Sequence, residues 1–152
     1  MIPIANTKIV VITAPELKDD GSPTIAYADT AGWSHARFLF VVGATDIATT
    51  AAPTITESNV AGSGYVAITS PTTAATSAAI TADDDGKAYA IDVDLTRGAR
   101  KRYLKPTFVC GNGSTGTNIC IVCILTRADS GAVNESTEVT NTTLFLAELI
   151  SA

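Results

Sequence analysis

The densest group of chemically active side chains is a cluster of positive charge in the stretch TRGARKRYLKPTF (96–108). Five of the ten lysines and arginines lie here, although the net charge of the chain is −5. They are Arg97, Arg100, Lys101, Arg102 and Lys105. Such a cluster can bind nucleic-acid phosphates, an acidic patch on another subunit, or carboxylates of the same fold. We take these five residues as the candidate contact site.

Ion pairs within the fold are the simplest of these three interpretations. Asp92 and Asp94 precede the cluster and would face Arg102 and Lys105 if the flanking strands formed a hairpin. Contact with an acidic patch on a neighbouring subunit comes second. Nucleic acid comes last, because five charges on one turn make a small footprint in a chain with 15 acidic residues.

The side chains that could support catalysis are few. His35 is the only histidine, so any Ser/His/Asp or Cys/His site must use this one ring. It stands in the stretch DTAGWSHAR (29–37), which we interpret as a turn, and a hydrogen-bonded surface histidine is the simpler expectation. The sequence therefore predicts no catalytic residue and a protein that is not an enzyme.

Metal and phosphate sites are also not expected. Cys120 and Cys123 form a Cys-x-x-Cys pair, but residues three apart on a strand face opposite sides. With Cys110 they are expected to be small core residues rather than ligands. The stretch DDDGK (83–87) lacks the alternating ligands of a calcium loop and is interpreted as a turn. GNGSTG (111–116) lacks the Lys-Ser/Thr of a phosphate loop, so we expect no metal and no cofactor.

The elements that must position these residues show apolar alternation with period two, which predicts strands. The expected strands are KIVVITA (8–14), RFLFVVG (37–43), GYVAITS (64–70), AYAIDVDL (88–95), RYLKPTFVC (102–110) and NICIVCILTR (118–127). PELKDDGSP (15–23) is expected to end the first of them. TTLFLAELI (142–150) is interpreted as a last strand or a short helix.

Three of these segments predict which side chains are buried. Along 88–95 the core face is Tyr89, Ile91, Val93 and Leu95, and the other face is Ala88, Ala90, Asp92 and Asp94. Along 102–110 the core face is Leu104, Pro106, Phe108 and Cys110. Its proline favours an edge or bulge position, and the segment 118–127 is expected to be buried on both faces.

Strands at short intervals without a long helix predict an all-β fold, a single antiparallel β-sandwich that is jelly-roll-like. We expect one domain over 1–152, with an extended N-terminal segment (1–7) and an exposed arm or loop (127–141). The absence of a leader pattern and of a long apolar run predicts a soluble chain made in a cytoplasm, with no membrane partner.

Several blocks of the sequence resemble a small structural protein of tailed bacteriophages and prophages. They are YADTAGWSHARFLFVVGATDIATTAAPTITES, AIDVDLTRGARKRYLKP, GNGSTGT and ILTRA, which together span about 27–128. The relatives show Asp-Val-Asp-Leu, a short Arg/Gly-rich turn, Lys-Arg-Tyr-Leu, a Gly-rich loop and Ile-Leu-Ser-Arg-Ala. The turn TRGAR (96–100) is longer here than the Arg-Gly-Arg of the relatives.

The resemblance implies a virion protein. The neutral composition and the small β-fold expected for this chain are similar to those of capsid decoration (cement) proteins, which bind the major capsid protein on the capsid surface. A homotrimer is the first expectation for its assembly and a dimer the second. The alternative is a tail, neck or head-fibre component with a receptor- or glycan-binding face, for which Trp33 and Tyr65 lie near loops. As a decoration protein or as a tail, neck or head-fibre component, the protein is expected to be made in the host cytoplasm.

Overall fold

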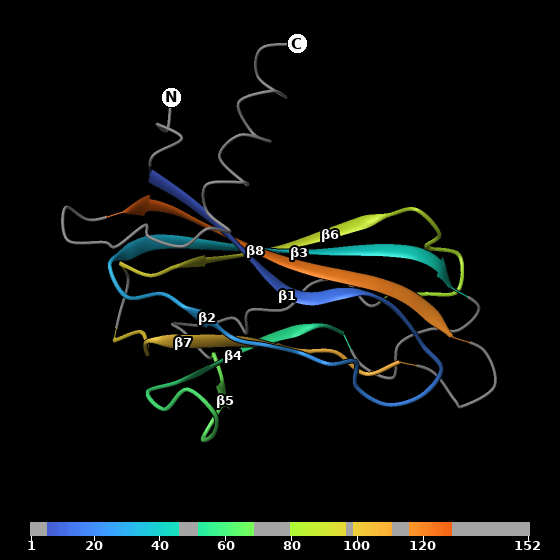
Figure 1. Cartoon of the computed structure of the whole chain (residues 1–152), viewed down its shortest axis with the longest axis horizontal. Coiled ribbons are helices and arrows are strands. Elements are labelled where there is room, and N and C mark those ends of the chain that lie inside the picture. The colour runs from blue at the N-terminus through green and yellow to red at the C-terminus, as the bar shows by residue number, and fades with distance from the viewer. Residues whose placement is uncertain (1–5, 46–51, 69–79, 97–98, 111–115, 129–152) are drawn as a thin grey trace, which may run out of the picture.

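The computed structural model describes residues 6–45, 52–68, 80–96, 99–110 and 116–128, and eight strands lie in these ranges. The first sheet contains, in spatial order, β1 (Thr7–Lys18), β8 (Thr117–Ala128), β3 (Trp33–Thr45) and β6 (Ala88–Asp94). The second contains β2 (Ala28–Asp29), β7 (Tyr103–Thr107), β4 (Thr54–Ser58) and β5 (Val66–Ala67). Figure 1 shows the first sheet above the second. The expected all-β antiparallel sandwich is confirmed.

The strand order is that of a jelly roll. β1 pairs with β8, β2 with β7, β3 with β6 and β4 with β5, all antiparallel. These four pairs form one long ribbon of two chain halves, and the ribbon is rolled so that alternate pairs fall in different sheets (Figure 1). The chain therefore crosses between the sheets at almost every connection.

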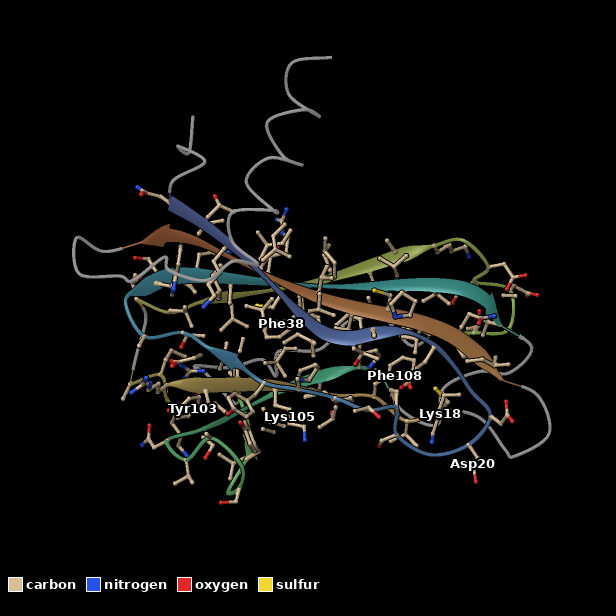
Figure 2. All side chains as sticks on the ribbon, viewed as in Figure 1. Lys18, Asp20, Phe38, Tyr103, Lys105 and Phe108 are labelled. Carbon is tan, nitrogen blue, oxygen red and sulfur yellow. The ribbon has the colours of Figure 1, made fainter. Side chains whose placement is uncertain are left out.

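Large apolar side chains fill the space between the sheets. Phe38 and Phe40 of β3 point inward and are fully buried, as are Leu104 of β7 and the nearby Phe108. The rings of Phe40 and Phe108 stack with their centroids 6.2 Å apart. Figure 2 shows Phe38 and Phe108 between the two sheets, so one core holds them together.

The predicted core faces of 88–95 and 102–110 are confirmed. Ile91 and Val93 are 4% exposed, while Asp92 and Asp94 face solvent on the other side of β6. Pro106 is buried in β7. β2, which lies beside β7, pairs only with Tyr103 and Leu104. The edge of β7 that faces β2 is therefore unpaired at Pro106, which suits a residue that has no N–H to donate.

The first and last described strands differ from the sequence prediction. β1 does not end before Pro15 but runs to Lys18, because register shifts between Val11 and Thr13 and between Thr13 and Glu16 take the proline out of the ladder. β8 is fully buried on its inner face only, since Cys120, Val122 and Ile124 on its outer face are half-buried.

Several expected segments fall partly or wholly outside the described residues. Thr7 begins β1, and 1–5 are not described. Residues 127 and 128 end β8, while the rest of the expected arm, 129–141, and the segment 142–150 are not described. The GNGST loop (111–115) and the candidate contact residue Arg97 are also outside the described part of the chain.

Candidate protein interface

The described residues of the basic cluster lie in the crossing from β6 in the first sheet to β7 in the second and, for Lys105, in β7 itself. Because these strands lie in different sheets, Asp92 and Asp94 do not face Arg102 and Lys105 across a hairpin. That expectation is wrong. The carboxylate of Asp92 instead accepts hydrogen bonds from Nε and Nη2 of Arg37, at 2.8 and 3.0 Å.

Arg102 is paired with a carboxylate that sequence reasoning did not select. Its Nε and Nη2 donate to the two carboxylate oxygens of Asp29, at 2.9 and 2.7 Å. The same hydrogen bonds raise the pKa of Arg102 and, against the opposing effect of burial, lower the pKa of Asp29. β2 brings Asp29 to this position, since Asp29 is the register partner of Tyr103 on β7.

Arg100 is held by Glu57 at the end of β4. Nη1 of Arg100 lies 3.6 Å from Oε2 of Glu57, and the two side chains are only 11% and 10% exposed. The same carboxylate oxygen accepts a hydrogen bond from the backbone N–H of Lys101, at 3.2 Å. Glu57 therefore neutralises one cation and fixes the backbone of the turn. The Nε of Arg100 is buried without a hydrogen-bond partner among the residues that the structure describes.

Lys101 and Lys105 carry the charge that remains. Neither forms an ion pair with a carboxylate within the described ranges. Nζ of Lys105 lies 5.8 Å from the centre of the Tyr65 ring, a cation–π contact. Of the four cations of the cluster that the structure describes, two are thus balanced locally and two are available to an acidic partner.

Three tyrosines lie beside Arg102 and Lys105 on the outer face of the second sheet. The rings of Tyr27 and Tyr103 meet edge to face at 5.4 Å, and the guanidinium of Arg102 lies 5.1 Å from the Tyr103 centroid. Tyr65 donates its hydroxyl to the Ala61 carbonyl at 2.8 Å, and burial together with the other two tyrosines raises its pKa. We call the set Tyr27, Tyr65, Tyr103, Arg102 and Lys105 the tyrosine–cation surface.

The alternation of β7 explains why this surface faces outward. Tyr103 and Lys105 alternate with Leu104 and Pro106, which are buried against the core. Figure 2 shows Tyr103 and Lys105 on the second sheet, away from Phe38. Tyrosine and arginine are enriched in protein interfaces because each combines a large contact area with hydrogen-bonding groups. The geometry is suited to contact with a protein surface that carries carboxylates.

A pocket of about 330 Å³ adjoins this surface at the end of the sandwich. Both sheets and the crossing contribute to its lining, which is Thr30, Ala31, Trp33, Asn59, Leu95, Arg100, Lys101 and Arg102. Trp33 is only 6% exposed and Phe108 is fully buried, so neither can act as a stacking platform for a base or a sugar. The support that the glycan-binding alternative drew from Trp33 is lost.

Sequence reasoning missed Tyr27, Asp29 and Glu57. They reach the basic crossing through pairings of β2 and β4 with β7, which join residues far apart in the chain. No local pattern of residues marks such a pairing. The stretch YAD (27–29) before an apolar strand is the only local sign of β2, and it does not show which strand β2 pairs with.

His35 lies in β3 rather than in a turn. Its Nε2 is 3.2 Å from Oδ1 of Asp92, and its Nδ1 is 3.5 Å from Oγ1 of Thr126. These three residues lie together on the outer face of the first sheet, but Asp92 is shared with Arg37, and none of the three lines the pocket beside the crossing. The arrangement stabilises the pairing of β3 with β6 and β8.

The aspartates before β6 close a turn, as expected. Asp84 accepts hydrogen bonds from the Thr81 backbone N–H and from Nζ of Lys87, both at 2.6 Å, and the lysine hydrogen bond holds the pKa of this carboxyl well below its usual range. Over the stretches that the structure describes, no three His, Cys, Asp or Glu side chains are grouped as metal ligands.

The cysteines lie on both faces of the first sheet and in the core beside it. Cys123 points into the core and Cys120 points out, as the strand geometry predicts, and burial raises the pKa of both thiols. Burial also raises the pKa of Cys110 to about 11. All three thiols are free, and the two buried ones act as small core residues.

Comparison of the chain with protein-family models, with curated proteins and with solved structures finds no match. Within the described ranges, no helix has the length and apolar character needed to span a bilayer.

Proposed function

We propose that the chain is a bacteriophage capsid decoration (cement) protein that binds and stabilises the lattice of the major capsid protein. The observation that carries this proposal is the tyrosine–cation surface, a patch rich in tyrosine on a β-sandwich. No described carboxylate balances its Lys105 or the Lys101 of the adjoining pocket. The resemblance of 27–128 to virion proteins of tailed phages supports the location on the capsid surface.

The mechanism follows from repetition. Each copy buries a modest patch against the capsid protein, and many copies on one shell supply the avidity that a single patch lacks. Lys101 and Lys105 reach carboxylates of the capsid protein, while the tyrosine rings supply most of the contact area. A homotrimer on a symmetry axis, or failing that a dimer, is the expected assembly. The reaction-free role needs no metal and no cofactor.

The first test is the copy number of the protein in purified virions, measured by quantitative mass spectrometry against the major capsid protein. A fixed ratio, with many copies to each particle, is the expected result. A handful of copies would place the protein in the tail or neck, and absence from the particle would overturn both assignments.

A second test uses the double substitution Tyr103→Ala and Lys105→Glu. Both side chains point away from the core, so the sandwich is retained while capsid affinity falls roughly tenfold or more. Lys18→Glu, which makes the same charge change at the end of β1 in the first sheet, is the matched control. Retention on virions is measured by sedimentation, and equal retention of both variants would exclude this contact surface.

A tail, neck or head-fibre component with a glycan-binding face is the second candidate. The three neighbouring tyrosines favour it, because sugars stack on aromatic rings. Binding on a glycan array that Tyr27→Ala abolishes, together with a low copy number in the virion, would select this function over decoration.

A further inference from the structure

The outer face of the first sheet is apolar. The register places Val11, Val122, Leu39 and Ala90 in one row across all four strands, with Ile9 and Ile124 in the row before and Cys120, Val41 and Ala88 in the row after. Val11 is 59% exposed and Val41 is 46% exposed. We call these nine residues the outer apolar face. The only charges within its rows are the mutually paired Arg37 and Asp92.

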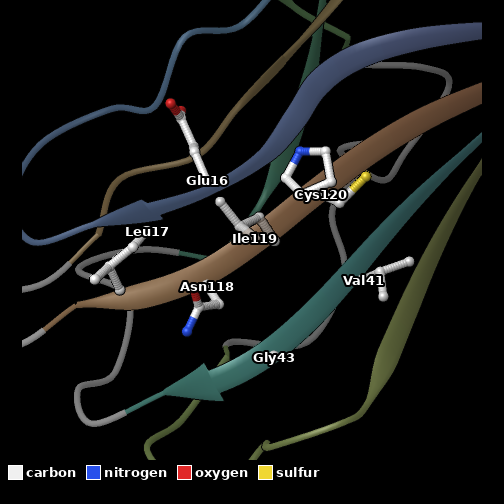
Figure 3. A pocket seen from close by; sticks show the side chains of 8 residues that line it. Glu16, Leu17, Val41, Gly43, Asn118, Ile119 and Cys120 are labelled. Atoms are coloured by element: carbon white, nitrogen blue, oxygen red, sulfur yellow. The ribbon is translucent and has the colours of Figure 1, made fainter.

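A groove of about 400 Å³ continues this face toward the start of β8. Its floor is Asn118 and Cys120, and β1 and β3 form its two sides (Figure 3). Gly43 keeps the groove open, because a Cβ at this position would meet the Cβ of Asn118 at 2.9 Å. Leu17 is 60% exposed at the rim. The face thus ends in a hollow that can receive large apolar side chains.

The dimensions of the face argue against a second copy as its occupant. Three rows on four strands cover about 400 Å², given the usual spacings of a β-sheet. A stable dimer of ordinary size buries about 800 Å² on each partner. A two-fold dimer whose axis passes through the groove would also bring one hollow against another, which leaves both unfilled. A segment tethered to the same chain needs less area, because its effective concentration is high.

The chain contains such a segment beyond β8. Residues 142–150 read TTLFLAELI, with five large apolar side chains and one charge. Residues 129–141 can span at most about 45 Å, and β8 from Ala128 back to Asn118 is about 34 Å long. The segment is therefore able to reach every row of the face and the groove.

We propose that the segment 142–150 of this chain binds the outer apolar face of the first sheet and its groove. The contact covers Cys120, Val122 and Ile124 on the outer face of β8. With these side chains covered, β8 would be buried on both faces, as its sequence predicts. This inference is independent of the capsid-binding function, because it concerns the opposite sheet from the tyrosine–cation surface.

Cys120 provides a native probe of this contact. It lies on the outer apolar face, whereas Cys110 and Cys123 are fully buried in the core. The full-length chain is treated with iodoacetamide, and the alkylation rate of each cysteine is followed by peptide mass spectrometry. The test variant is Leu146→Asp with Leu149→Asp. The matched control is Thr142→Asp with Thr143→Asp, which adds the same charge to the same segment.

We expect Cys120 to react roughly tenfold faster in the leucine variant than in the wild type, and the threonine variant to behave as the wild type. Cys110 and Cys123 stay protected in all three proteins, which verifies that the sandwich is folded. Equal Cys120 rates in the two variants would overturn the proposal. A wild-type rate that rises on dilution would also overturn it, because a second copy would then be the occupant.

A disulfide provides the second measurement. Under mild oxidation, Leu146→Cys is expected to form an intramolecular bond with Cys120, while Val60→Cys, exposed on the other side of the molecule, is not. A bond between two chains, or equal yields for the two variants, would contradict the placement of the segment on its own sheet.

Discussion

Single carboxylates decide how much positive charge the basic crossing presents. Asp29 and Glu57 balance Arg102 and Arg100, so two lysines remain of the four cations in the described part of the cluster, and three tyrosines lie nearby. On the other sheet, Asp92 has the same role toward Arg37 and also lies 3.2 Å from Nε2 of His35. Asp29 of β2 and Glu57 of β4 pair with arginines of the crossing that precedes β7, and Asp92 of β6 pairs with Arg37 of β3. These contacts link strands of one sheet side by side.

Asp92 makes the stability of the protein dependent on acid pH. The hydrogen bond with Arg37 holds the pKa of Asp92 in the folded protein below the reference value of 3.8. The stabilisation is complete above that value and is lost as the pH falls through the lower pKa of the folded state. Since the pair is about half exposed, Asp92→Asn should cost less than about 1 kcal/mol at pH 7.

Urea unfolding at neutral and at strongly acid pH measures this effect. The wild type should lose its advantage over Asp92→Asn in acid. Asp20→Asn, at an exposed position without an ion pair among the described residues, should show no difference at either pH. An advantage that persists unchanged in acid would show that Asp92 stabilises the fold through something other than its charge.

Gly43 is a position at which a single added methyl group should be costly. Gly43→Ala should lower the free energy of unfolding by about 1–3 kcal/mol, because its Cβ would lie 2.9 Å from the Cβ of Asn118 on β8. Gly62→Ala is the matched control, with no atom within 4 Å of the added Cβ. Equal unfolding midpoints for the two variants would mean that β3 and β8 separate at this point without cost.

At the scale of the strands, local alternation predicts burial but not pairing. The pattern of 88–95 correctly gave Ile91 and Val93 to the core, because side chains alternate across any strand. The same pattern could not show that β6 pairs with β3 rather than with β7, since pairing depends on the path of the whole chain. The false hairpin between β6 and β7 and the missed Asp29 have this common cause.

Pro15 does not end the first strand, although the sequence predicted that it would. Pro15 suggested that the first strand stops, yet two register shifts let β1 continue for three further residues that pair with β8. Those residues include Leu17, which forms the rim of the groove. A bulge cannot be read from composition, because the same residues also suit a turn. The groove was therefore not predictable, whereas the strand 118–127 that supplies its floor was.

The two faces of β8 should differ in what they contribute to stability. Ile121→Ala should cost about 2–5 kcal/mol, because the side chain is fully buried between the sheets and its loss leaves a cavity. Ile124→Ala, on the outer face of the same strand, should cost less than half as much, since that side chain is half-buried. Chemical denaturation of both variants makes the comparison, and equal costs would mean that the outer face is packed as tightly as the core.

At the scale of the whole molecule, the two sheets present different surfaces. The second sheet carries tyrosines and lysines, and the first carries aliphatic side chains around a groove. A net charge of −5 with the basic crossing half neutralised is unfavourable for binding polyanions. The molecule is better suited to hold a protein partner on one side than to hold nucleic acid.

Binding to nucleic acid should accordingly be absent. Double-stranded and single-stranded DNA should migrate unchanged in a gel at low salt, because the net charge is −5 and two of the four described cations of the crossing are balanced by carboxylates. The variant Asp29→Asn leaves the exposed Arg102 without its carboxylate and is the comparison in which any affinity for DNA should be greater. A retarded band with the wild-type protein that disappears as salt is added would contradict this prediction.

The rolled ribbon also determines when the protein can fold. β8 lies between β1 and β3, yet it is the last of the described strands to be synthesised. A nascent chain that has not yet reached Thr117 exposes the inner edges of β1 and β3 with nothing between them, so the first sheet can close only after β8 leaves the ribosome. Folding that depends on such distant pairings takes milliseconds to seconds. Until then the aliphatic strands are open to aggregation, and a chaperone or rapid assembly is most useful in that interval.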